Sequence, residues 1–133
     1  MGAIRVAATV LASGLAVPVF SSALQISAIG FSNGHWLAPL GALPHGLSML
    51  PLVIIAAPVN VTGAALVAGV SLGLQALIGR RSLPIWIADG AIVGVLELMW
   101  LFPYPRPALV VLGVLGSWTL ASAAMWLALA RRP

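Results

Sequence analysis

Four apolar stretches occupy most of the sequence, and the polar and turn-forming residues lie mainly between them. A helix rises about 1.5 Å per residue, so roughly 20 apolar residues cross the hydrocarbon core of a bilayer. Only 6% of the 133 residues are charged, which is too few to cover the surface of a water-soluble domain. The sequence therefore predicts an all-α integral membrane protein with four transmembrane helices in a compact bundle.

Arginines, prolines and glycines separate the stretches and set their predicted bounds. We expect residues 27–59 to form an outer segment and the whole chain, residues 1–133, to form a single membrane domain. The expected spans cover residues 3–26, 60–79, 84–102 and 108–130.

The sequence AAPVNVTG interrupts the longest apolar run. One helix over residues 47–79 would be about 50 Å long, which is too long for a bilayer without a steep tilt. Pro58 disfavours helix in the preceding turn, and Asn60 is a favourable helix N-cap. We therefore expect a helix to begin at Asn60, after a separate interfacial or re-entrant helical segment at about residues 47–57. A helix break that forms a binding site, as in secondary transporters, is the alternative.

The distribution of arginines predicts the orientation of the chain. Five of the six arginines lie on one side of the predicted spans, and only Arg106 lies on the other. Positively charged residues are more frequent in cytoplasmic loops, so we expect cytoplasmic N- and C-termini in a plasma (inner) membrane. The arginines are too scattered to follow a phosphate backbone, so we expect no nucleic-acid partner.

Small residues recur at helical spacing on all four predicted spans. In a bilayer, such stripes let helix backbones approach closely, and they are typical of helix contacts. The positions that we expect at helix contacts are Gly69, Gly73, Gly90, Gly94, Gly113 and Ser117.

The only two acidic residues, Asp89 and Glu97, both lie on the third span. An acid inside a membrane is costly and therefore suggests a function. On an ideal helix the two are about 12 Å and 80° apart, which excludes a pair that shares one proton. Together with Asn60 and Gln75 they would line an ion, proton or other polar path. The alternative is that each acid pairs with an arginine or histidine near its end of the helix.

A second polar group, His35, His45 and Arg106, is predicted at the outer boundary. The two histidines and Glu97 would offer ligands for a haem or a metal. The proline-containing segment between the histidines fixes no ligand geometry, however, and interfacial histidines commonly bond to loop carbonyls. We therefore predict no metal site and leave the cofactor open.

Three classes of function remain. The first is a non-catalytic subunit or assembly component of a larger membrane complex, in contact with lipid and with other subunits or copies of itself. The second is a small homo-oligomeric ion- or proton-coupled transporter or channel, with Glu97 and Asp89 lining its path. The third is a membrane-embedded enzyme that acts on lipid through His45 and Glu97. The small size and the absence of a recognisable catalytic motif favour the first class.

Overall fold

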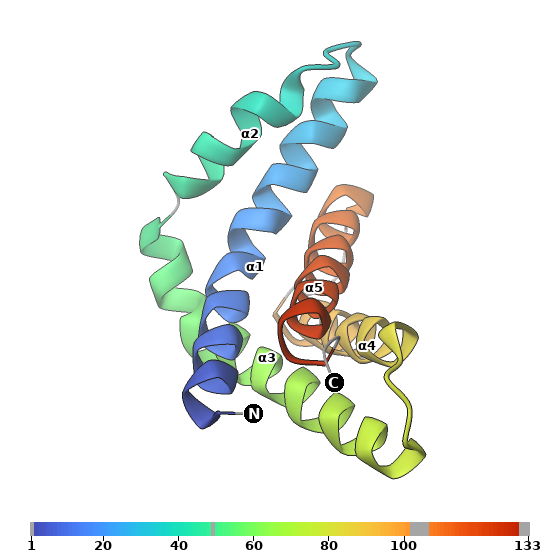
Figure 1. Ribbon diagram of the computed structural model, residues 1–133. Coiled ribbons are helices and arrows are strands. Elements are labelled where there is room, and N and C mark those ends of the chain that lie inside the picture. Colours follow the sequence, from blue (N-terminus) through green and yellow to red (C-terminus); the bar gives the residue numbers. More distant parts are fainter. Residues whose placement is uncertain (1, 49, 102–106, 131–133) are drawn as a thin grey trace.

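The computed structural model describes residues 2–48, 50–101 and 107–130. Over this part, the chain forms helices and no strand (Figure 1). All of them except α2 are long and apolar enough to cross a membrane. The predicted class, an all-α membrane protein with four transmembrane helices in a compact bundle, is confirmed. The helices are α1 (Ala3–Ser32), α2 (Ala38–Leu47), α3 (Leu50–Ile78), α4 (Leu83–Leu101) and α5 (Ala108–Leu129).

The segment before the second span differs from the prediction in its bounds. A short additional helix is present, but it is α2, which lies earlier in the chain than residues 47–57. The predicted helix start at Asn60 is wrong, because α3 continues through Pro58 from Leu50. A broken backbone in hydrocarbon leaves N–H and C=O groups without partners, so a continuous helix costs less than an interruption.

Pro58 changes the direction of α3 without ending it. Its ring nitrogen cannot donate to the carbonyl of Ile54, four residues earlier. The Thr62 hydroxyl donates to the Pro58 carbonyl over 2.6 Å, a contact that often accompanies helix bending. Figure 1 shows the N-terminal part of α3 at an angle to the rest of that helix. The expected change of axis before the second span is therefore present as a bend within one helix.

Glycines in the left-handed region end α1 and α3. Gly34 has a φ of 79° after α1, and Gly79 has a φ of 71° after α3. A residue without a Cβ adopts this conformation without strain, which lets the chain leave a helix abruptly. The helix α1 is longer than predicted and ends at Ser32.

The helix α5 is the most buried of the membrane-spanning helices. It packs most extensively on α1 and α4 and also touches α3, whereas α2 packs along α1. Two tryptophans, Trp86 on α4 and Trp118 on α5, are fully buried. The buried residues of α5 are Gly113, Val114, Ser117, Trp118, Ala121, Ser122, Met125 and Leu129.

Several small residues lie where helices approach closely. A Cβ on Gly90 of α4 would lie 2.8 Å from the Trp118 carbonyl of α5. A Cβ on Gly94 would lie 3.0 Å from Leu115 of α5, and one on Gly113 of α5 would lie 2.6 Å from Gln25 of α1. Ser117 is buried as well. These four predicted contact positions therefore lie inside the bundle.

The two remaining contact positions, Gly69 and Gly73 on α3, are exposed. A Cβ on either glycine would meet no atom within 4 Å. The expectation that every small-residue stripe packs inside the bundle therefore does not hold for α3. The polar side chains of α3, described below, occupy its inward face instead.

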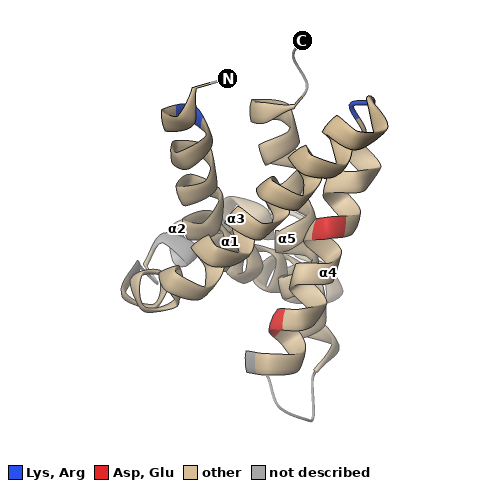
Figure 2. Ribbon diagram, turned by 90° about the horizontal axis from the view of Figure 1, so that it is seen from below, with Lys and Arg blue, Asp and Glu red and all other residues tan. Residues whose placement is uncertain are grey.

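The described arginines gather at one end of the molecule. Figure 2 shows them near the start of α1 and in the turn between α3 and α4. The Arg5 guanidinium donates to the carbonyl of Ala128, close to the C-terminal end of α5. The beginning of α1 and the end of α5 therefore lie side by side, as an even number of membrane crossings requires.

We predict that Gly90→Ala destabilises the bundle, because the new methyl group would overlap Ser122 and the Trp118 carbonyl. Overpacking of this kind costs about 1–3 kcal/mol. Gly69→Ala is the matched control, because its methyl group would meet open space. Thermal unfolding in detergent should show a lower midpoint for Gly90→Ala and no decrease for Gly69→Ala. An equal decrease in both variants would contradict the observed α4–α5 contact.

Candidate functional site

Glu97 of α4 meets side chains of two neighbouring helices. The indole Nε1–H of Trp118, on α5, donates to Glu97 Oε2 over 2.8 Å. Asn60 of α3 lies on another side of the carboxylate. With its amide nitrogen facing Glu97, it donates over 3.1 Å to Oε2 and 3.3 Å to Oε1. This orientation avoids two facing oxygens, so it is the one that both side chains can satisfy.

Asn60 owes its position to the continuous helix of α3. Only 3% of its surface is exposed, although its neighbours Val59 and Val61 are half-buried and Thr62 is exposed. Burying an amide is unfavourable unless it is hydrogen-bonded, and a carboxylate is a strong acceptor. Asn60 therefore serves as a partner for Glu97 rather than as the predicted N-cap.

Asp89 and Gln75 take part in separate contacts between α3 and α4. The Ser71 hydroxyl donates to Asp89 Oδ2 over 2.5 Å, and Trp86 Nε1–H donates to Gln75 Oε1 over 3.0 Å. Ser71 and Gln75 are one turn apart on α3, as Trp86 and Asp89 approximately are on α4, so the two contacts are neighbours along the helices. The predicted polar path is thus divided into two groups at different levels of α4 (Figure 2).

Three partners of the predicted residues were not identified as candidates from the sequence. They are Ser71, Trp86 and Trp118, which donate to the side chains of Asp89, Gln75 and Glu97. A buried tryptophan usually finds an acceptor for its N–H group. The tryptophans in the apolar stretches therefore could have indicated hydrogen bonds inside the bundle.

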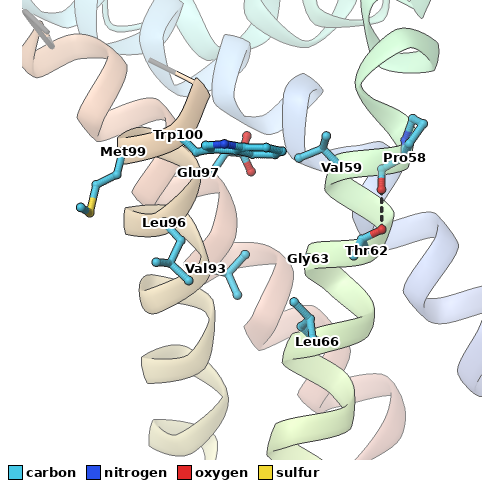
Figure 3. Close-up of a pocket in the computed structure, with 10 residues that line it drawn as sticks. All are labelled: Pro58, Val59, Thr62, Gly63, Leu66, Val93, Leu96, Glu97, Met99 and Trp100. Carbon is cyan, nitrogen blue, oxygen red and sulfur yellow. Dashed lines mark hydrogen bonds between the residues drawn. The ribbon is translucent and has the colours of Figure 1, made fainter. Parts of the chain in front are cut away.

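A groove of about 710 Å³ runs between α3 and α4 on the outside of the bundle. Figure 3 shows Trp100 extending from α4 towards Val59 of α3, next to Glu97, at one end of the groove. Leu66 and Val93 lie towards its other end. The lining residues are Pro58, Val59, Thr62, Gly63, Leu66, Val93, Leu96, Glu97, Met99 and Trp100. Glu97 is the only ionisable residue among them.

The predicted outer polar group is described only in part. His35 is exposed in the turn between α1 and α2. The side chain of His45 and all of Arg106 lie outside the described residues. Within the described part, no three histidine, aspartate or glutamate side chains are grouped as ligands for a metal ion.

Comparison of the chain with protein-family models, with curated proteins and with solved structures found no match. A carboxylate with neutral donors at the end of an apolar groove can hold a cation or a proton.

We predict that the Asn60–Glu97 contact stabilises the fold and that the two residues are energetically coupled. Asn60→Leu should destabilise the protein by about 1–3 kcal/mol, because the carboxylate loses a partner. In a Glu97→Leu background the same change should cost less, with a coupling of about 0.5–3 kcal/mol. Denaturant unfolding of the four proteins measures this double-mutant cycle. Additive effects would mean that the two side chains do not interact.

Proposed function

We propose that the protein is a non-catalytic subunit or assembly component of a larger membrane complex. The observation that supports this proposal is a stripe of small residues on α3 that the chain itself leaves exposed. Helical arithmetic at about 100° per residue puts it roughly opposite the buried positions Val67 and Ser71. We call these residues the α3 stripe: Ala65, Gly69, Gly73 and Ala76, all of which are exposed.

The glycines at helix contacts inside the bundle indicate that the α3 stripe also suits a helix contact. Gly90 and Gly94 bring α4 close to α5, and Gly113 brings α5 close to α1. Lipid tails are as apolar as leucine, so helices associate in a bilayer through close packing and polar contacts. The same type of surface on the outside of the bundle suits a helix of a partner subunit or of a second copy of this chain.

The polar contacts support a structural role for the acids. Each of them accepts a hydrogen bond from a different helix, Asp89 from Ser71 of α3 and Glu97 from Trp118 of α5. Contacts of this kind hold a membrane bundle in one arrangement. A scaffold that other subunits bind requires such an arrangement and needs no catalytic group.

A small ion- or proton-coupled transporter or channel is the second candidate. The burial of Asn60 against Glu97 and the position of Glu97 at the groove favour it. Asp89 does not line this groove, so a path through both acids would require other side-chain positions. Cation or proton flux in vesicles that Glu97→Gln abolishes would favour the transporter.

We predict that a Gly69→Leu, Gly73→Leu double variant no longer assembles, because two bulky side chains prevent close helix packing. Native purification of the untagged wild-type protein, followed by mass spectrometry, should give a fixed stoichiometry with other subunits or with further copies. The double variant should lose this association and keep the helical circular dichroism of the wild type.

Ala88→Leu on α4 is the matched control, since Ala88 is exposed and lies outside the α3 stripe. It should copurify like the wild type. Recovery of wild-type protein as a monomer without partners would contradict the proposed function. Retention of the assembly in the double variant would contradict the role of the α3 stripe.

We also propose that both ends of the chain face the cytoplasm, since the described arginines gather at that end of the bundle (Figure 2). The chain has no cysteine, so single cysteines can be labelled without background. A membrane-impermeant maleimide should label Asn33→Cys in intact cells and should label Ser82→Cys only after lysis. The reverse pattern would invert the orientation.

A further inference from the structure

The groove between α3 and α4 combines an apolar surface with one acidic group. Its lining is otherwise apolar apart from the Trp100 indole N–H and the Thr62 hydroxyl, which already donates to the Pro58 carbonyl. Its volume of about 710 Å³ lies within the usual range of small-molecule sites. Such a composition fits a ligand that has a hydrocarbon part and a single polar group.

The contacts of Glu97 indicate the charge of that polar group. Its two donors, the indole of Trp118 and the amide of Asn60, are neutral. They occupy hydrogen-bonding positions of an ionised carboxylate without balancing its charge. A carboxylate offers about four lone-pair positions, and among the described residues Oε1 has only the 3.3 Å contact with Asn60, so acceptor capacity remains. A cationic donor such as an ammonium group would supply both the proton and the charge.

Trp100 adds a second element of cation recognition. Trp100 follows Glu97 by three residues on α4, which puts the two on the same side of the helix, and both line the groove. The face of an indole attracts a cation, most strongly where water is excluded. Carboxylate and indole together therefore favour an ammonium group over a neutral alcohol of the same length.

The direction of the groove fits an amphiphile in a bilayer leaflet. Glu97 is four residues, or about 6 Å, from the end of α4 that lies opposite the described arginines. From there the apolar lining continues towards the middle of the helix, over about 10 Å between Trp100 and Val93. A single-chain amphiphile takes this orientation in a membrane, with its head near the boundary and its chain inwards.

We propose that the α3–α4 groove binds a single-chain cationic amphiphile. Its ammonium group contacts Glu97 and the Trp100 indole, and its hydrocarbon chain lies along Val93, Leu96 and Leu66. The proposal goes beyond the assembly role and uses none of the α3-stripe residues, which do not line the groove.

Equilibrium binding of radiolabelled decylammonium to the full-length protein in phosphatidylcholine nanodiscs tests the proposal. Protein-free nanodiscs measure the partitioning of the probe into lipid. We expect saturable binding of one decylammonium per protein, at least about tenfold tighter than binding of decanol. Equal binding of decanol would mean that the groove takes only hydrocarbon, and would overturn the proposal.

Two substitutions test the head-group contacts. Glu97→Gln should weaken decylammonium binding by at least about tenfold and leave decanol binding unchanged. Trp100→Leu should weaken decylammonium binding about two- to fivefold. Asp89→Asn is the matched control, because Asp89 is bonded to Ser71 and lies outside the groove lining. Unchanged binding in Glu97→Gln, or an equal loss in Asp89→Asn, would overturn the site.

A further variant fills the groove and leaves the Glu97 contacts intact. Leu66→Trp should block decylammonium binding, whereas Leu120→Trp, at an exposed leucine of α5, should not. Binding that survives Leu66→Trp would overturn the proposal. Adding phosphatidylethanolamine to the nanodiscs separates the two sources of an ammonium group. Displacement of the probe by this lipid would assign the groove to a phospholipid head group and overturn the single-chain ligand.

Discussion

The two carboxylates inside the apolar bundle accept hydrogen bonds from neighbouring helices, and these contacts determine how α3, α4 and α5 meet. Glu97 takes donors from α3 and α5, and Asp89 takes one from α3. An unpaired group in hydrocarbon would cost several kcal/mol, so few rotations of these helices are acceptable. Because α4 and α5 approach closely at Gly90, the Trp118 indole of α5 can donate to Glu97 of α4.

The inward direction of the polar residues leaves two neighbouring parts of the α3 surface available. One carries the α3 stripe, which has the composition of a helix contact and is exposed, and a Cβ on Gly69 or Gly73 would meet no atom of the described residues within 4 Å. The other borders the groove, where the bend at Pro58 and the Trp100 side chain define one end. Assembly and ligand binding are therefore assigned to different residues on neighbouring parts of α3, so substitutions test each proposal separately.

The fold class was predictable from the sequence because it depends on the length and the composition of the apolar stretches. The rotation of α3 was not, because two patterns on that helix compete. The small residues around Gly69 favoured that face as the inward one, whereas Asn60 and Ser71 lie on nearly the opposite face. Unsatisfied polar groups cost more than a missed close contact, so the polar face lies inside. The helix α3 continues through Pro58 for a related reason, because a break would leave backbone N–H and C=O groups unsatisfied in hydrocarbon.

The contact between Glu97 and the Trp118 indole joins α4 to α5 inside the bundle, and the nitrogen-15 NMR signals of the tryptophan side chains report on it. Trp118 is fully buried, whereas Trp36 is 77% exposed. The Trp118 indole N–H should persist in deuterated buffer after that of Trp36 has exchanged, and its signal should shift strongly in Glu97→Leu. A Trp118 signal that exchanges as fast as that of Trp36, or that does not respond to Glu97→Leu, would mean that this buried contact does not exist.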